Sequence, residues 1–516
     1  MKRPTHINFS VLTGLGNVGG ALRPDKVGVG FHTDAVAGVE TGDHPKLDPS
    51  GHKAPPALKA ALLLAPLFLA GCTLGPEYAR PATATPSAWK ETAAEVPDAP
   101  LPAAWWTIFH DAELDALASQ VVAANQDLQR AAARLAEARA LARLSAADRY
   151  PSVSGGTSYT RSRASGTGVE ANDHRTGVEL GYELDLWGRV RRGNEAARAE
   201  ATAVAHDLAA ARLSLTAEAA QNYLQLRSLD AERTVIEATL ALRRDTLGLQ
   251  ETRYQAGLIN EADVTRARTE VANVEAELHA VTRSRARLEH ALAVLCGRPP
   301  AGFAIAARAG QDVPPVIPAG LPSSLLQRRP DVAAVESQLQ AASARIGVAK
   351  ADFFPRISLT GSAGMASSEL GSLFDADSRT WSFGPSLHVP LFDGGRNRAN
   401  LEASQARYEQ SVASYRNTVL DAFREVEDAL SDLGTLAREV EAVNRALVSA
   451  RATAALAHER YQKGLSSYLD VVDAQRGVFQ AERQLARLHG ASAVSTVLLA
   501  KAIGGGWEPA VVIAQH

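Results

Sequence analysis

The chain has 516 residues, of which 46% are hydrophobic and 22% charged, an ordinary composition for an ordered protein. This length exceeds one compact core and predicts several units or one elongated architecture. The 54 basic and 57 acidic side chains leave a net charge of -3, which gives no electrostatic signature of nucleic-acid binding. Two cysteines, Cys72 and Cys296, are too few for a disulfide framework or a structural zinc site.

The strongest apolar run covers residues 60–70 and ends just before Cys72. It is too short for a spanning helix, which needs about 20 residues, and it follows Lys53 and Lys59 as the core of a secretory signal would. The string Leu-Ala-Gly-Cys that ends at Cys72 looks like a bacterial lipobox. We therefore expect cleavage before Cys72 and a lipid on its sulfur; the alternative is a short buried helix that ends in cysteine.

Residues 1–71 are accordingly interpreted as a leader and lipoprotein signal peptide. Within it, residues 1–50 are polar and aperiodic, and we interpret them as a start-site artefact or a dispensable leader. Thr73 follows the cysteine in place of the aspartate of an inner-membrane retention signal, which favours sorting to the outer membrane.

The rest of the chain contains two copies of one unit. Residues 253–258 (ArgTyrGlnAlaGlyLeu) return as 460–465 (ArgTyrGlnLysGlyLeu), and Asp263 returns as Asp470 at the same offset of 207. Equal offsets at several places predict an internal repeat. The predicted boundaries are 72–110 for a lipidated N-terminus and collar segment, 111–300 for repeat 1, 301–328 for an inter-repeat collar segment, 329–506 for repeat 2 and 507–516 for a C-terminal tail.

Each copy is predicted to contain one helix, two strands and two long helices. In copy one these are a helix over about 114–147, strands over about 152–163 and 176–186, and helices over about 191–255 and 261–296. In copy two they are a helix over about 332–351, strands over about 356–367 and 380–390, and helices over about 396–462 and 468–503. Helices of sixty-odd residues extend roughly 90–100 Å, so they must pack side by side into a rod or a tube.

The strands alternate apolar and polar residues: Val178, Leu180 and Tyr182 share one face, and Glu179 and Glu183 lie on the other. Strands of about 9–11 residues suit a tilted transmembrane barrel. Four strands close too small a barrel, so a membrane location requires several chains to share one. The alternative is a soluble antiparallel sheet.

Specific strings then give the chain a family resemblance. These are the lipobox, Gly75-Pro76, Trp105-Trp106, the repeated TyrGlnXaaGlyLeu strings, and the closing Gly504-Gly505-Gly506-Trp507. In these features, from Cys72 to Trp507, the chain resembles the TolC-like outer-membrane efflux proteins, in the lipoprotein branch often called NodT-type. The extended N-terminus departs from that pattern.

The resemblance implies an α+β membrane protein that forms a homotrimer. Each protomer would give four strands to one twelve-stranded transmembrane β-barrel and its helices to a long periplasmic α-helical barrel. It implies an outer-membrane location with a lipid anchor and an extension into the periplasm. The implied partners are outer-membrane lipid, a periplasmic adaptor (membrane fusion) protein and an inner-membrane pump of RND type.

The resemblance also assigns candidate site residues at the helix junctions. Gly257, Leu258, Gly464 and Leu465 lie at turns that break helical runs, and in the family such turns receive the adaptor. The alternative is that the glycines merely turn the chain.

Just after the second turn, Leu469, Asp470, Asp473 and Arg476 match the aperture residues of the family. Asp470 and Asp473 are three residues apart and share a helix face, so threefold symmetry would make two acidic rings that attract cations. Leu469 could add an apolar ring, and Arg476 could pair with Asp473. The alternative is a solvated charged face.

By the same resemblance, Asp263 and Tyr461 match residues that link the inner and outer helix pairs in the closed state. The expected function is thus a passive exit duct of a tripartite efflux pump, gated at its periplasmic aperture and opened when adaptor and pump dock. We expect no enzyme activity and no cofactor beyond the lipid on Cys72, because no catalytic motif is present. The alternative is a lipid-anchored periplasmic coiled-coil scaffold without a pore.

Overall fold

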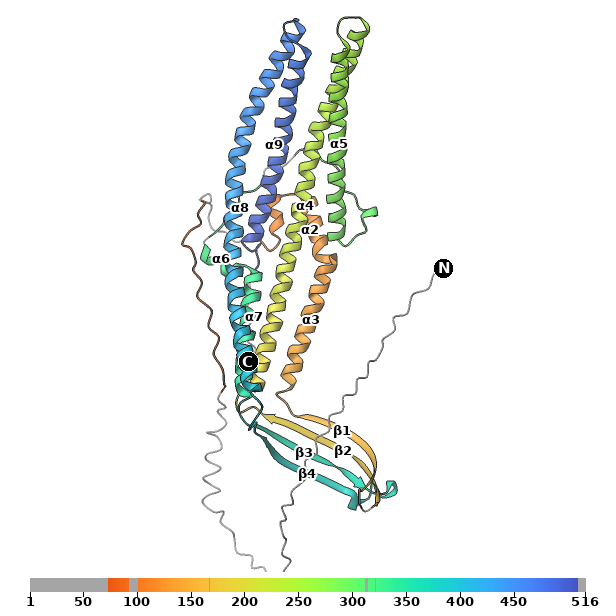
Figure 1. Ribbon diagram of the computed structural model, residues 1–516, viewed down its shortest axis with the longest axis vertical. Helices are drawn as coiled ribbons and strands as arrows, with labels where there is room; N and C mark the ends of the chain where they lie inside the picture. The colour runs from red at the N-terminus through yellow and green to blue at the C-terminus, as the bar shows by residue number, and fades with distance from the viewer. Residues whose placement is uncertain (1–72, 92–100, 167, 311–313, 321, 509–516) are drawn as a thin grey trace, which may run out of the picture. The chain divides into compact units, whose positions relative to one another are not determined.

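The computed structural model describes residues 73–508, apart from 92–100, 167, 311–313 and 321. Cys72, the leader 1–71 and the tail from residue 509 therefore lie outside the described residues. Helices dominate (Figure 1). Three pairs of helices have equal numbers of residues. These are α3 (Gln126–Ala147) and α7 (Pro330–Ala351) with 22 residues, α4 (Arg189–Gln255) and α8 (Arg396–Gln462) with 67, and α5 (Glu261–Leu295) and α9 (Tyr468–Ala502) with 35.

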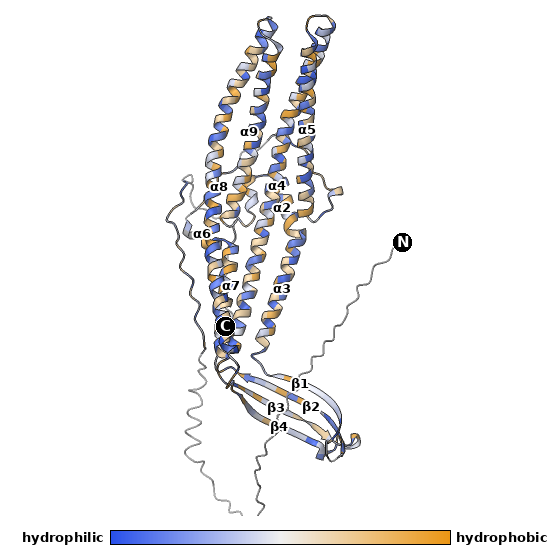
Figure 2. Cartoon of the chain, viewed as in Figure 1, coloured by the Kyte–Doolittle hydropathy of each residue, from blue (hydrophilic) through white to orange (hydrophobic). Residues whose placement is uncertain are grey.

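The long helices form two antiparallel hairpins, α4–α5 and α8–α9, whose turns lie at the same end (Figure 1). Helix α4 packs against α3, α5, α7 and α9, whereas α8 packs against α7 and α9. Helix α4 is therefore central, and α3, α5 and α8 lie at the edges. Hydrophilic and hydrophobic residues interleave along these helices (Figure 2), and in the part of the chain with a described structure none is long and apolar enough to cross a membrane.

The largest apolar core forms where η1 (Trp105–Phe109) and α2 (Ala112–Ala124) meet the long helices. Trp105, Tyr223 and Tyr415 are its largest fully buried aromatic side chains. A second cluster joins α4, α5 and α9 closer to the turns. Its buried members are Ile236, Leu240, Val274, Val281 and Phe479. The heptad-spaced valines of α5 thus pack between helices, as a coiled-coil seam does.

The prediction of one helix over 114–147 is wrong, because α2 and α3 are separate helices that meet at Asn125. The side-chain Oδ1 of Asn125 accepts hydrogen bonds from the backbone N–H groups of Asp127 (2.9 Å) and Leu128 (3.1 Å). Its Nδ2 donates to the carbonyl oxygen of Leu295 at 2.9 Å. Asn125 therefore caps α3 and fastens it to the end of α5.

Four strands form one antiparallel sheet in chain order: β1 (Ser152–Arg163), β2 (Glu170–Leu184), β3 (Arg356–Ser367) and β4 (Arg379–His388). Strand β2 begins at Glu170 and not at about 176, because its pairing with β1 continues to Arg163. Gly177 of β2 lies opposite Gly364 of β3, where a Cβ on Gly364 would be 2.3 Å from the Thr176 carbonyl oxygen. Only glycine permits this close approach.

Short elements and turns join these parts. They are α6 (Pro322–Arg328), η2 (Pro300–Gly302), η3 (Leu370–Ser372) and η4 (Ala376–Ser378). Helices α4 and α8 each begin after a left-handed glycine, Gly188 (φ 77°) and Gly395 (φ 88°). Near the first of these, the Leu74 N–H donates to the Trp187 carbonyl at 3.1 Å. The next residue, Gly75, lies so close to Gly347 of α7 that a Cβ on it would be 2.5 Å from the Gly347 Cα.

Candidate functional site at the hairpin turns

The first hairpin turn ends α4 with a Schellman motif. Gly257 adopts φ 72°, its N–H donates to the Tyr254 carbonyl at 2.8 Å, and the Leu258 N–H donates to the Arg253 carbonyl at 2.9 Å. This pair of bonds satisfies carbonyls that a helix end leaves free, and the left-handed conformation favours glycine.

The second turn repeats this geometry. Gly464 also has φ 72°, its N–H donates to the Tyr461 carbonyl at 3.0 Å, and the Leu465 N–H donates to the Arg460 carbonyl at 2.8 Å. The side chains of Leu258 and Leu465 are 71% and 66% exposed, although a leucine at this position often packs back on its helix. Each turn therefore presents one apolar side chain to its surroundings.

The start of α9 carries three of the predicted aperture residues. Ser467 and Asp470 form a capping box: the Asp470 N–H donates to the Ser467 hydroxyl at 3.4 Å, and the Ser467 N–H donates to the Asp470 carboxylate at 2.9 Å. Leu469, Asp470 and Asp473 are all exposed. Asp470 thus has a local task at the helix start besides any task that its charge performs.

Arg476, the fourth predicted aperture residue, joins α9 to α5. Its Nη1 donates to the Asp473 carboxylate at 3.3 Å, and its Nε donates to Glu270 at 3.1 Å, with a second, shorter bond from Nη2 to the same oxygen. The bond to Glu270 raises the pKa of Arg476 above its ordinary value. The expected pair with Asp473 is present, and a stronger partner lies on the neighbouring hairpin.

Glu270 is buried and lies between two arginines. Arg243 of α4 is fully buried, approaches the other Glu270 oxygen at 3.6 Å and donates to the Gln475 side chain at 2.7 Å. Burial lowers the pKa of Arg243 because it disfavours the charged form. Helices α4, α5 and α9 thereby meet in one ionic group.

Tyr461, one of the two predicted closed-state links, joins α8 to α4. Its hydroxyl accepts hydrogen bonds from Arg253 at 2.7 Å and from Gln250 at 3.2 Å. Asp263 does not bond with Tyr461: its carboxylate accepts from Arg266 of its own helix at 3.3 Å. The described contacts place Tyr461 between the hairpins and Asp263 within one of them.

The sequence reasoning missed Arg243, Gln250, Arg253 and Glu270. One signal was available for Glu270, since two glutamates of α5 and two arginines of α9 have the same spacing of seven residues. The pairs are Glu270 with Arg476 and Glu277 with Arg483. When two helices with a seven-residue repeat are neighbours, ion pairs between them are expected at this spacing.

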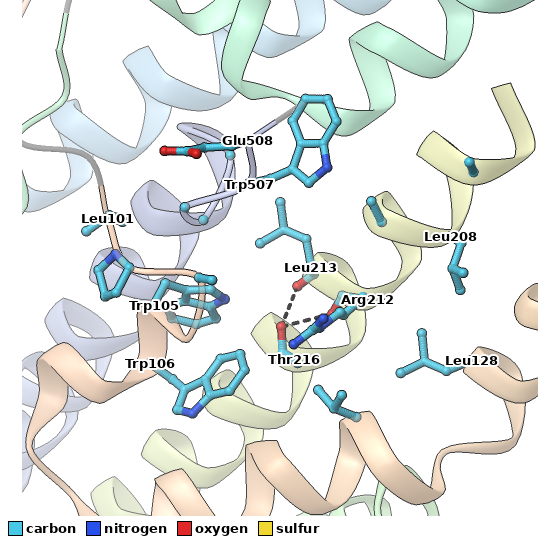
Figure 3. Close-up of a pocket in the computed structure, with 18 of the residues that line it drawn as sticks. Leu101, Trp105, Trp106, Leu128, Leu208, Arg212, Leu213, Thr216, Trp507 and Glu508 are labelled. Carbon is cyan, nitrogen blue, oxygen red and sulfur yellow. Dashed lines mark hydrogen bonds between the residues drawn. The ribbon is translucent and has the colours of Figure 1, made fainter. Parts of the chain in front are cut away.

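A pocket of about 970 Å³ lies elsewhere, beside η1 and α4 (Figure 3). Trp105, Leu128, Leu213 and Trp507 are among the residues that line it, and the hydroxyl of Thr216 donates to carbonyls of its own helix. Across residues 73–508 with the gaps given above, no three His, Cys, Asp or Glu side chains are grouped so as to hold a metal ion. The pocket and the hairpin turns are separate features.

Comparison with known proteins identifies the family. The model of the outer membrane efflux protein family matches residues 117–298 and 321–505. The chain belongs to the outer membrane efflux protein family. The resemblance in its sequence is thus confirmed, and this outer membrane efflux protein is a channel component that resides in the outer membrane and extends into the periplasm.

Individual relatives match over nearly their whole length. Outer membrane protein OprJ of Pseudomonas aeruginosa is 37% identical, over 89% of this chain and 98% of its own. The cation efflux system protein CusC of Escherichia coli is 35% identical, over 86% and 97%. The solved structure of the outer-membrane channel OprN superposes with a TM-score of 0.80 at 33% identity, over 85% of this chain and all of its own.

Proposed function

We propose that this family member is a passive exit duct of a tripartite efflux pump, closed at rest by the residues around the hairpin turns. A periplasmic adaptor and an inner-membrane pump of RND type would dock and open it. The observation that carries the proposal is the concentration, near the turns, of exposed α9 carboxylates beside an ion pair and a hydrogen bond between the hairpins. No catalytic role is proposed.

The duct would be a homotrimer. Strands β1 and β4 each have one described neighbour, and four strands are too few to close a barrel with a lumen. Three protomers would supply twelve strands, and their hairpins would continue the tube. Trp381 of β4 is 80% exposed in the single chain and Phe383 is also exposed, as side chains that face lipid would be.

In such a trimer, Asp470 and Asp473 would form two acidic rings and Leu469 an apolar one. Crowded carboxylates at a constriction attract cations and hold charged groups across the pore. Arg476 and Tyr461 would keep each α8–α9 hairpin against its neighbour while the aperture is closed. Asp263 would contribute less to this closed-state link, because its described partner lies on its own helix.

Gly257, Leu258, Gly464 and Leu465 would form the docking surface for the adaptor. Their turns expose two leucines per protomer, and exposed apolar side chains beside charged ones are typical of binding sites for an amphipathic helical partner.

Cys72 would carry the lipid that anchors the chain in the outer membrane. The collar would consist of the segments before residue 110, between 301 and 328 and after 507. Among these, η1, η2 and α6 pack beside the long helices.

Single-channel conductance in a planar bilayer tests the gate. The purified protein is compared with the Asp470→Ser/Asp473→Ser variant. We expect a small, stable conductance that rises sharply in the variant, together with weaker block by divalent cations. Well-inserted trimers with equal conductance in both forms would exclude these carboxylates as the gate, and failure to insert would exclude the duct.

The capping box demands a matched control. Ser467→Ala removes the hydroxyl that caps α9 but keeps both carboxylates. A conductance close to that of the unmodified protein would assign the effect of the double variant to charge. An equal rise in Ser467→Ala would assign it to loss of the cap.

A further inference from the structure

A second ionic group fastens the hairpins farther from the turns. Glu232 of α4 is 2% exposed and accepts hydrogen bonds from Arg483 of α9 at 3.0 and 2.8 Å and from Arg487 at 2.6 Å. Arg483 also donates to Glu277 of α5 at 2.7 Å. Arg483 of α9 therefore links α4 and α5 through two carboxylates.

The residues just before Glu232 fasten α4 to other elements. Asp230 is buried and accepts from Arg285 of α5 at 2.6 Å and from Arg227 at 3.0 Å. Arg285 and Arg227 also donate to the carbonyls of Ile305 and Ala306, both at 2.7 Å, and Arg227 pairs with Glu113 of α2. This group holds the segment that follows α5.

Ser228 completes the arrangement, because its hydroxyl donates to the Ala486 carbonyl of α9 at 3.2 Å. We name Arg227, Ser228, Asp230 and Glu232 the α4 belt. The second apolar cluster lies next to it on the side of the turns. The α4 belt thus joins α2, α5, α9 and the segment around 305 at one level of α4.

The links nearer the turns are more weakly bonded. The side chains of Asp473 and Arg476 are 59% and 49% exposed. The buried Arg243 donates one hydrogen bond, to Gln475, and lies 3.6 Å from a Glu270 oxygen, whereas Glu232 accepts hydrogen bonds of 3.0, 2.8 and 2.6 Å. Exposed ion pairs contribute little free energy, whereas removing one partner of a buried pair is costly. The resistance of the α4–α9 contact to separation therefore increases from the turns toward the α4 belt.

Helix α8 has no equivalent of the α4 belt. The positions 207 residues later are Gly434, Thr435, Ala437 and Glu439, and all four are exposed. Glu439 accepts one bond, from Gln484 of its own hairpin at 3.3 Å. The α8–α9 hairpin is therefore fastened to the first hairpin at this level through α9.

We propose that the α4 belt is the fixed end of the opening movement. Helix α9 then separates from α4 only in the segment between the second apolar cluster and the hairpin turns. The inference rests on the proposed gated duct and deepens it by naming Glu232 and Asp230 as positioning residues. The mobile part of α4 then runs from about Arg243 to Gln255, a length of roughly 20 Å at about 1.5 Å per residue.

Two cysteine pairs test where the movement stops. Leu247→Cys/Val472→Cys places thiols in the apolar cluster near the turns, and Ser228→Cys/Ala486→Cys places them at the α4 belt. Each is introduced beside Asp470→Ser/Asp473→Ser, with the single-cysteine variants as controls. Disulfide formation is verified by mass spectrometry, and conductance is measured before and after reduction.

We expect the pair near the turns to suppress the high conductance until it is reduced, and the pair at the belt to leave it unchanged. Suppression by both pairs would place the hinge beyond the belt and overturn the proposal. Suppression by neither would show that α9 does not leave α4 at all, which also overturns it. If the double variant conducts no better than the unmodified chain, the proposed gate fails and the next measurement decides on the belt.

Hydrogen–deuterium exchange of the unmodified trimer needs no open variant. Amides of α9 from 468 to 478 should exchange faster than those from 483 to 490, with the step at the Glu232 contact. Glu232→Gln should move this step toward residue 490, whereas Glu275→Gln, which breaks an exposed pair with Arg244, should not. Uniform exchange along α9, or an unmoved step in Glu232→Gln, would overturn the proposal.

Discussion

At the scale of single residues, Glu232 shows how much a charge depends on its surroundings. Its carboxylate is buried between two arginines, whereas the carboxylate of Glu275 pairs with Arg244 at the surface. Glu232→Gln weakens the hydrogen bonds from Arg483, which keeps Glu277 as a counter-charge, and from Arg487, and it should lower the free energy of unfolding by about 2–3 kcal/mol. Glu275→Gln should lower it by about 1 kcal/mol or less. Urea titration of the detergent-solubilised protein measures both; equal losses would contradict this difference.

The same residue gives a pH dependence with a definite sign. Burial raises the pKa of the Glu232 carboxyl, but the bonds from Arg487 and Arg483 outweigh burial and leave the pKa below its ordinary value of 4.5. A lowered pKa adds stability that is fully present above the ordinary value and is lost as the pH falls through the folded-state value. The α4–α9 contact should therefore persist from pH 7 to 5 and weaken only below 4.5. Amide exchange at each pH measures it, and Glu232→Gln should lack this acid transition.

At the scale of elements, the hairpin turns allow the cost of a left-handed backbone to be measured without any steric clash. Gly257 and Gly464 have positive φ, and no atom lies within 4 Å of a Cβ placed on either. Replacing either by alanine should therefore cost about 1–2 kcal/mol through the left-handed backbone alone. Thermal unfolding of Gly257→Ala and Gly464→Ala measures this cost. Gly434→Ala is the control, since Gly434 lies within α8 in a helical conformation and its replacement should be neutral or stabilising.

Elements were predictable where local chemistry decides them. Strands β1 and β3 and helix α8 occupy their predicted ranges, because turn residues and a proline-bounded pattern mark both ends. The break at Asn125 had a local signal, because asparagine is a good N-cap, but the helical pattern on both sides reads as continuous. The bond from Asn125 to the Leu295 carbonyl, which is distant in the sequence, was not predictable. The bonds of Tyr461 with Gln250 and Arg253 likewise depend on which helices become neighbours. No local pattern reveals that choice.

At the scale of the whole molecule, the sheet presents apolar side chains that a lone chain leaves exposed. Trp381, Phe383 and Leu387 lie on one face of β4, and Ser386 lies on the other. In a lipid-facing band, Trp381→Arg should destabilise the inserted protein by about 2–4 kcal/mol, most at the mid-plane. Ser386→Arg is the control on the opposite face. Heat-modifiable migration of membrane extracts measures folding, and equal effects of both substitutions would contradict a lipid-facing Trp381.

The contact between Gly75 and Gly347 has a consequence for how deep the protein sits. Leu74 and Gly75 are fixed where β2 gives way to α4, and Cys72 precedes Leu74 by two residues, a reach of roughly 7 Å along the chain. If Cys72 carries the lipid proposed above, its acyl chains would enter the bilayer within that reach of the strand ends. The lipid would then fix how deeply the sheet lies in the bilayer, besides holding the chain at the membrane.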